Sequence, residues 1–398
     1  FMAGSICYSV LRKVTGITSM IRFLKSLRQL AVIFILAAPV AVAADATPPA
    51  TSDDSDWTRV VRSSPYWVSQ GVFENILTIR RWVLKESGYC ASADRHVLYD
   101  MRGRFLAWIS DGEDREATPR LLNTTRKSLY ENGKVEDWVA GEAGQTGYPF
   151  ALSCDQPHVN VDEAVARYLG TLPADRIWGA WDDLNFADSS APESLHDALI
   201  YVYEHRSRQN RLTLPQALPR YLAGQILIES GAQARAHSRA NARGILQLSP
   251  AALSDCEIAP DNFWHRLAQI DCALRLMNQN ARNLAPVFQQ RFGHLPEAKR
   301  DRLFTLLLVQ AYHGGAGRVQ ALLDDPVLAQ PAEYFAANHE RFTAGDIAFG
   351  LIFHNLGRDR LGLASLYYVA DVQLATEALC RTAKLKSTEF CEWKYSTN

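Results

Sequence analysis

Apolar residues recur at helical spacing almost without interruption from residue 195 to residue 379, and this periodicity restricts the C-terminal half of the chain to packed helices. We expect this half to form a predominantly α-helical domain, 195–379. The helices predicted within it are 195–209, 214–230, a segment around 250–253, 263–284 and 300–313, with further turns to about 379.

The preceding region, 57–185, mixes helical and strand signals, so we predict an α+β domain of unknown function. Gln70–Lys85 has helical periodicity, and His96–Ile109 indicates two strands around a turn at Arg102-Gly103. Asn160, followed by Glu163 and an apolar run, is typical of an N-cap and a helix start. Residues 186–194, rich in Asp, Ser and Pro, are predicted to be the linker between the two domains.

Residues 1–44 differ from the rest of the chain, because they hold five basic side chains and no acidic one. From Met20 a basic stretch, the apolar run Leu30–Ala38 and Ala41-Val42-Ala43 follow in the order of a secretory signal peptide. The apolar run is short for a membrane span, so cleavage is favoured over an uncleaved anchor. We therefore expect a periplasmic or secreted protein with a flexible leader, 45–56, and no stable membrane span.

Charge argues against a nucleic-acid partner. Without residues 1–44 the chain keeps 37 of its 42 basic side chains and all 43 acidic ones, which gives a mildly acidic balance.

Six cysteines remain after the signal, an even number that suggests disulfides in an oxidising compartment. Proximity in sequence favours the pairs Cys90–Cys154, Cys256–Cys272 and Cys380–Cys391, and the last would tie down a C-terminal tail, 380–398. The alternative is free, buried cysteines. No Cys-x-x-Cys or His-x-x-x-His spacing occurs, so neither a metal nor another cofactor is expected.

Glu229 lies in the last turn of the predicted helix 214–230, for which Thr213 is a candidate N-cap and Gly231 a stop signal. Its neighbours are apolar, and burial would raise the pKa of the carboxyl as a general acid requires. The alternative is an ordinary, exposed glutamate at a helix end.

Two motifs carry a family resemblance. Glu229-Ser230, Ser238 and Gly244-Ile-Leu-Gln247-Leu-Ser-Pro250 resemble the Glu-Ser, Ser and Gly-Leu-Met-Gln-Leu-Met-Pro signature of soluble lytic transglycosylases. Ala311-Tyr312-His313-Gly314-Gly315-Ala316-Gly317-Arg318-Val319 is similar to the family's Ala-Tyr-Asn-Ala-Gly-x-Gly-Arg-Val element. The resemblance covers less than half of the chain and implies a lysozyme-like fold for 195–379.

The resemblance also implies an activity, the non-hydrolytic cleavage of peptidoglycan glycan strands. Glu229 would protonate the oxygen between N-acetylmuramic acid and N-acetylglucosamine, and would then take the C6 hydroxyl proton as a 1,6-anhydro ring closes. A hydrolase normally needs a second carboxylate, and from Ser230 onwards the first acidic residue is Asp255.

Substrate contacts are implied for Ser238, Gln247 and Tyr312, the last being the tyrosine whose hydroxyl would face the glutamate. Leu246 replaces a methionine that lines the cleft, and His313 replaces an asparagine. Tyr368, in Tyr367-Tyr368-Val369, resembles a late Tyr-Val element of the family. For Ser238 a loop-capping role is the alternative, and for Tyr312 and His313 a structural one.

Two other functions remain open. One is a hydrolase similar to goose-type lysozyme, and the other is a non-catalytic cell-wall-binding or scaffold protein. The N-terminal region is a candidate site for a protein partner. Its tryptophans are expected in the core, with Trp178 and Trp181 as the best candidates for binding a glycan.

Overall fold

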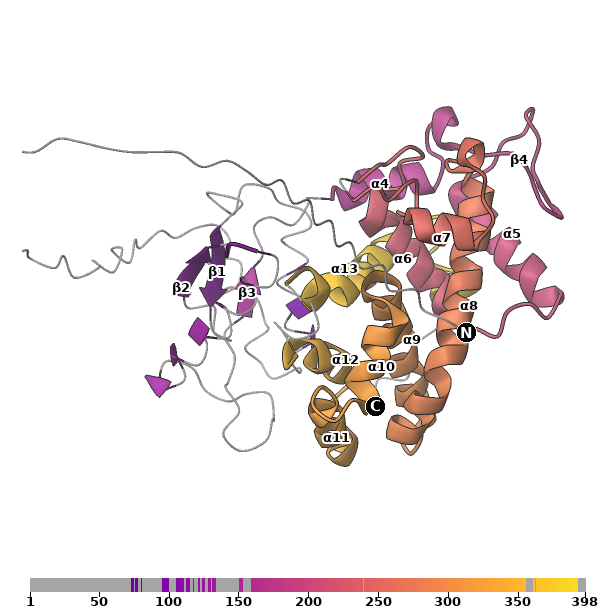
Figure 1. Ribbon diagram of the computed structural model, residues 1–398. Helices are drawn as coiled ribbons and strands as arrows, with labels where there is room; N and C mark the ends of the chain where they lie inside the picture. The colour runs from indigo at the N-terminus through magenta and orange to yellow at the C-terminus, as the bar shows by residue number, and fades with distance from the viewer. Residues whose placement is uncertain are drawn as a thin grey trace, which may run out of the picture. The chain divides into compact units, whose positions relative to one another are not determined.

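Helices make up most of the residues that the computed structural model describes, which are 159–238, 240–355, 361 and 363–392, with shorter stretches between 73 and 152 (Figure 1). All of these residues belong to one unit, Asp53–Asn398. The predicted signal peptide and leader, 1–56, and the predicted pair Cys90–Cys154 lie outside the described residues.

The helices predicted within 195–379 appear close to their expected positions. The bounds of the described helices are α4 Val161–Tyr168, α5 Leu195–Arg208, α6 Leu218–Ser230, α7 Pro250–Asp255, α8 Arg266–Phe292, α9 Glu297–Gly314, α10 Ala316–Asp324, α11 Gln330–Ala337, α12 Ala344–Phe353, α13 Leu363–Cys380 and α14 Glu389–Glu392. Short 3-10 turns occupy Pro173–Asp175, Pro260–Asn262 and His339–Arg341.

The strands of the described residues form two small antiparallel sheets. The first has the order β2-β1-β3, with β1 Arg95–Tyr99 paired to β2 Phe105–Ser110 and to β3 Phe150–Leu152. The two strands expected within 96–109 are thus confirmed. The second is a hairpin of β4 Gly179–Trp181 and β5 Leu184–Phe186. A mostly helical protein with a small antiparallel component is therefore correct as the coarse fold class.

Helix starts follow local side-chain chemistry at α4 and α5, and depart from the prediction at α6. Asn160 caps α4 by accepting from the Glu163 amide, as expected. Ser194 and Asp197 form a reciprocal capping box on α5. Thr213, in contrast, does not cap α6. Its amide and hydroxyl both donate to the Asn278 side chain on α8, and α6 begins only at Leu218, after a turn closed by the Leu218 amide on the carbonyl of Pro215.

Helix α8 is longer than predicted because it continues to Phe292 through Pro286. A proline inside a helix costs about 3 kcal/mol. Val287, Phe288 and Phe292 are all buried beyond it. Burying each such side chain stabilises by about 1.5–3 kcal/mol, which is enough to carry the helix past the proline.

Helix α6 lies at the centre of the helical packing. It contacts α13, α5, α9 and α4, and in Figure 1 it lies among the helices of this part of the chain. Its residues from Leu218 to Leu227 are buried, apart from Arg220, which is half-buried. Because α6 is buried on nearly every side, it is apolar around its whole circumference. The same packing fixes the position of the residues at its end.

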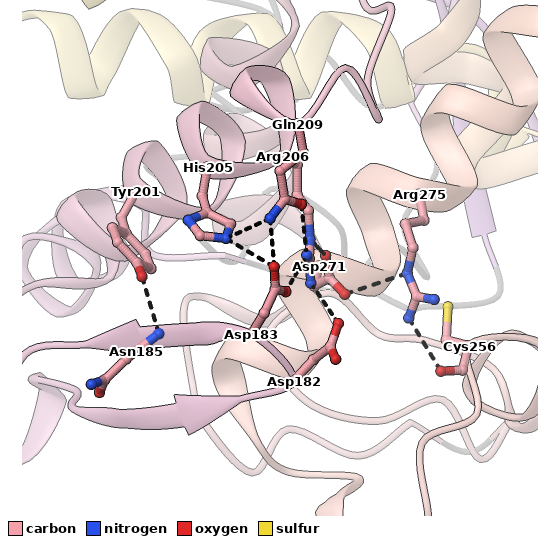
Figure 2. A network of polar contacts seen from close by, with 10 residues as sticks. All are labelled: Asp182, Asp183, Asn185, Tyr201, His205, Arg206, Gln209, Cys256, Asp271 and Arg275. Atoms are coloured by element: carbon pink, nitrogen blue, oxygen red, sulfur yellow. Dashed lines mark hydrogen bonds and ion pairs between the residues drawn. The ribbon is translucent and has the colours of Figure 1, made fainter.

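The β4–β5 hairpin is attached to α5 and α8 through one buried guanidinium, Arg206 (Figure 2). Arg206 donates to Asp271 of α8 at 2.6 Å, to Asp182 at 3.1 Å and to Asp183. Gln209 and His205 also bond Asp183, and these contacts hold the pKa of its carboxyl below the usual range. The hairpin therefore has a definite position although it is only six paired residues long.

The segment predicted to be a linker, 186–194, is ordered here. It contains the end of β5, the paired residues Asp188 and Ala191, and Glu193, which pairs with Ile177. Across it, α4 contacts α5, α6 and α13. The helix α4, which we had assigned to the N-terminal domain, thus packs directly on the helical domain.

Disulfides join Cys256 to Cys272 and Cys380 to Cys391, as predicted. The first links α8 to the residue that ends α7, and the second holds α14 against the end of α13. Within the described part of the chain, no helix has the length and apolar character needed to span a membrane.

Candidate functional site

Glu229 is placed by the end of α6. Gly231 adopts a left-handed conformation (φ 61°), and its amide bonds back to the carbonyl of Leu227, which closes the helix. The Ser230 hydroxyl lies within hydrogen-bond distance of the carbonyls of Ile226, 3.0 Å, and Ile245, 2.8 Å, so its one hydrogen connects the helix end to the loop that follows or to the preceding turn. Glu229 keeps some exposed surface, in contrast to the buried turns before it.

A tyrosine hydroxyl contacts the Glu229 carboxyl. Tyr368 of α13 is buried and donates to Oε1 of Glu229 at 2.5 Å. Gln225, one turn before Glu229 and completely buried, donates from Nε2 to the same hydroxyl at 3.0 Å. Because the Tyr368 oxygen accepts from Gln225, its own hydrogen is directed to the carboxylate.

Burial raises the pKa of Glu229 to about 7, while the hydrogen bond from Tyr368 acts in the opposite direction. A carboxyl that is about half protonated at neutral pH can donate a proton and later accept one. Burial, followed by the charge of Glu229, raises the pKa of Tyr368 well above its usual range. The phenol therefore stays protonated and remains a donor.

The loop after α6 folds back beside Glu229. Besides Gly231 and Ala232 at its start, three of its residues adopt the left-handed region. Asn241 (φ 64°) confirms the expectation that asparagine tolerates this backbone where glycine is usual. Gly244 (φ 76°) has no room for a side chain, since a Cβ would lie 1.8 Å from Nε2 of Gln269. Gln247 (φ 46°) is the third.

Ser238 and Gln247 both line the cleft beside Glu229, and both also stabilise the loop. The Ser238 oxygen accepts from the Ala242 amide at 3.0 Å, which is the loop-capping role left open by the sequence. Gln247 donates from Nε2 to the carbonyls of Ala236 and Gly244. The Ser238 hydroxyl hydrogen and the Gln247 carbonyl oxygen are the groups that these side chains can offer to a ligand.

Tyr312 and His313 follow each other at the end of α9 but differ in position. Tyr312 donates to the carbonyl of Leu246 at 2.6 Å, so it fastens the loop. Burial and the nearby charge of Glu229 raise its pKa well above the usual range. His313 lines the cleft and stacks on the Tyr368 ring at 4.3 Å between centroids. The hydroxyl bonded to Glu229 thus belongs to Tyr368, whereas Tyr312, which we expect to face the glutamate, lies near its charge and bonds Leu246.

Leu246 does not lie in the cleft. Its side chain is completely buried, and its carbonyl is the acceptor for Tyr312. The prediction of Leu246 as a substrate contact is therefore wrong. The left-handed backbone of the loop turns this side chain into the core, which sequence alignment of a motif does not reveal.

The cleft has a volume of about 680 Å³ and three walls. One is the end of α6 with the following loop, the second is His313 with Tyr368 and Asp371, and the third is α4 with the residues before it. The described residues that line it are Val159, Asn160, Glu163, Arg167, Ile228, Glu229, Ser230, Gly231, Gln233, Ala236, His237, Ser238, Gln247, His313, Tyr368 and Asp371.

Two carboxylates besides Glu229 line this cleft, and each is paired with an arginine. Asp371, buried on α13, accepts from Nε and Nη2 of Arg80 at 2.7 Å each. Glu163 accepts from Arg167 at 2.8 Å within α4. Among the described residues, no group of three or more His, Cys, Asp or Glu side chains could hold a metal ion.

Several residues of the site escaped prediction from sequence. Gln225, which lies buried behind the cleft, had a usable signal, because its spacing of four residues places it on the same helix face as Glu229. No sequence signal placed Asn160, Glu163 and Arg167 in the cleft. More than 60 residues separate them from Glu229, as their numbers show, and only tertiary packing brings them near. Of the two candidate tryptophans, Trp178 is 57% exposed, and Trp181 packs on His265. Neither belongs to the cleft.

No protein-family model matches this chain, and no curated protein sequence matches it either.

Proposed function

We propose that this protein is a peptidoglycan lytic transglycosylase that cleaves the bond between N-acetylmuramic acid and N-acetylglucosamine without water. The observation that carries the proposal is Glu229, a cleft carboxyl with a pKa of about 7 that is held by a buried Tyr368 hydroxyl. The motif resemblance around Glu229, Ser238, Gln247 and Tyr312 supports the same activity.

In the proposed reaction, protonated Glu229 donates to the glycosidic oxygen, and the bond to the muramic acid C1 breaks. The substrate's own N-acetyl group stabilises the positive charge that develops there. Ionised Glu229 then removes the proton of the C6 hydroxyl, whose oxygen closes on C1 to form a 1,6-anhydro ring. The carboxyl is protonated again at the end, so one group serves as acid and then as base.

The roles of acid and of base each require a property that Glu229 has in this site. A raised pKa keeps the proton on Glu229 at neutral pH, and the Tyr368 hydrogen bond stabilises the carboxylate once that proton has left. Asp371 is paired with Arg80 and both side chains are 1% exposed, which disfavours Asp371 as a second catalytic carboxylate. Two disulfides support a periplasmic or secreted location.

The test is product analysis on purified sacculi. We expect 1,6-anhydro ends by mass spectrometry from the wild type, and a loss of at least a thousandfold in rate from Glu229→Gln with the fold retained. Turnover by Glu229→Gln near the wild-type rate would refute the assignment. Binding of sacculi with no product from either protein would favour a non-catalytic cell-wall-binding protein.

A hydrolase similar to goose-type lysozyme is the second candidate, and one observation favours it. Glu163 lines the cleft and its side chain is 60% exposed, so it could serve as the base that activates water. Reducing ends in place of anhydro ends, together with inactivity of Glu163→Gln, would decide for hydrolysis.

A further inference from the structure

The α4 wall of the cleft, made of Asn160, Glu163 and Arg167, carries a fixed positive charge beside the candidate acid. Of the described residues that line the cleft, Arg167 is the one arginine, and lysine is absent. Its Nη1 donates to the carbonyl of Gly231 at 3.2 Å, two residues after Glu229. The guanidinium is therefore attached to the same helix end that presents the acid.

Arg167 is held in place by hydrogen bonds that leave several of its N–H donors for a ligand. Nη2 donates to Glu163 at 2.8 Å, and Glu163 also accepts from Asn160 at 2.9 Å. Asn160 is in turn the N-cap of α4, so the three polar groups form one connected set. A guanidinium has five N–H donors, two of them are engaged in these contacts, and 30% of the side chain is exposed.

The ligand group that matches this arrangement is a carboxylate. A planar fork of donors binds carboxylates with two parallel hydrogen bonds, and neutral sugar hydroxyls gain much less from a fixed cation. The glycan backbone of peptidoglycan carries no charge. Its acidic groups hang from the lactyl ether of muramic acid, either as the free lactyl carboxylate or as the carboxylates of an attached peptide stem.

We propose that Arg167 is a specificity-determining residue that binds a substrate carboxylate on the α4 wall, so that the enzyme selects acidic muramic acid residues over neutral amino-sugar chains. This inference rests on the proposed function for its substrate. It assigns α4, a helix outside the predicted catalytic domain, to substrate recognition. Glu163 competes with the ligand for the guanidinium and moderates its affinity.

The experiment compares dissociation constants for three ligands by calorimetry, in a Glu229→Gln background so that no ligand is consumed. The ligands are glycan fragments with peptide stems, the same fragments freed of stems by an amidase, and neutral chitotetraose. Arg167→Gln removes the charge but retains an amide that can donate to Gly231. We expect about tenfold weaker binding of carboxylate-bearing ligands and an unchanged constant for chitotetraose.

The three ligands separate the two sources of the carboxylate. A loss confined to stem-bearing fragments assigns the interaction to the peptide, and a loss confined to stem-free fragments assigns it to the lactyl group. Glu163→Gln should act in the opposite direction, with about threefold tighter binding of the acidic ligand, because it removes the internal competitor.

Arg291 supplies a matched control. It donates to the carbonyl of Leu323 and pairs with Glu333 at 3.1 Å, with 25% and 60% of the two side chains exposed, yet it does not line the cleft. Arg291→Gln should leave all three dissociation constants unchanged. Circular dichroism melts of each variant show whether the fold is retained.

Equal weakening for all three ligands, chitotetraose included, would reduce Arg167 to a packing residue and overturn the inference. No weakening for any of them would do the same. Failure of the proposed function is seen separately, as the absence of anhydro products from the wild type, and it leaves the binding comparison intact.

Discussion

At the scale of single residues, the proposed chemistry depends on how Tyr368 and Gln225 set the pKa of Glu229. Gln225 donates to the Tyr368 hydroxyl, and Tyr368 donates to Glu229. This chain opposes the effect of burial and keeps the pKa of Glu229 near 7. Without it, burial alone would hold the proton more tightly and the carboxylate needed in the second step would be scarcer.

Tyr368→Phe should therefore raise the pKa of Glu229, because the lost hydrogen bond stabilised the ionised form. We expect the alkaline limb of the rate profile to move up by about one pH unit. The measurement is kcat/KM on sacculi between pH 5 and pH 9. Tyr312→Phe is the control, since that hydroxyl donates to Leu246 and should leave the limb where it is. An unmoved limb in Tyr368→Phe would contradict the role given to this hydroxyl.

The raised pKa also predicts how stability depends on pH. The pKa of Glu229 is about 7 when folded and near 4.5 when unfolded, so the unfolded chain releases this proton first as pH rises. Glu229 therefore does not lower the free energy of unfolding below about pH 4.5. As pH rises from there to about 7, the free energy of unfolding falls by about 3 kcal/mol.

Glu229→Gln removes this loss. The free energy of unfolding of the variant minus that of the wild type should be about 3 kcal/mol larger at pH 9 than at pH 4. Urea titration at the two pH values measures this change. The same difference at both pH values would mean that Glu229 is not buried in solution.

At the scale of elements, the loop from Gly231 to Ser249 gives the site its shape. Tyr312 bonds this loop at the carbonyl of Leu246, and Gln247 bonds two of its other carbonyls. Gly244 lies where a left-handed backbone meets the buried side chain of Gln269 on α8. The loop conformation thus depends on one residue having no side chain.

Gly244→Ala should destabilise the protein by more than about 2 kcal/mol, since it adds both backbone strain and a clash with Gln269. Activity should fall by more than the loss of folded protein explains, because Ser238 and Gln247 move with the loop. Gly317→Ala is the control, since Gly317 lies within α10 with nothing near its added Cβ. That substitution should be neutral or stabilise by up to about 1 kcal/mol. Thermal melts and rates on sacculi test both variants.

At the scale of the whole molecule, the segment around residues 73–80 is fastened to the helical domain at two points. The Phe73 amide donates to Asp346 at the start of α12, and Arg80 forms a bidentate pair with Asp371 of α13. Arg80 also lies over the ring of Tyr367, next to Tyr368. The N-terminal region therefore contributes to the back of the cleft through a pair in which both side chains are 1% exposed.

Arg80→Met should cost about 3–5 kcal/mol, because it removes the guanidinium that pairs with the buried Asp371 carboxylate. The double variant Arg80→Met/Asp371→Leu should recover much of that loss. Urea titration of the two single variants and the double variant gives the coupling between them. Additive effects would show that the pair does not join the two regions energetically.

The sequence by itself determined the helical class, the strand pair within 96–109, the N-cap at Asn160, two of the disulfides and the position of Glu229 at a helix end. These features follow from short-range rules of periodicity, capping and spacing, which act between residues close in the chain.

Only the tertiary structure decided which tyrosine bonds Glu229, that Leu246 faces the core, and that α4 forms a wall of the cleft. Each of these depends on contacts between segments some 60 to 140 residues apart. In those places buried area and backbone handedness outweigh local preference, as they also do at Thr213 and Pro286.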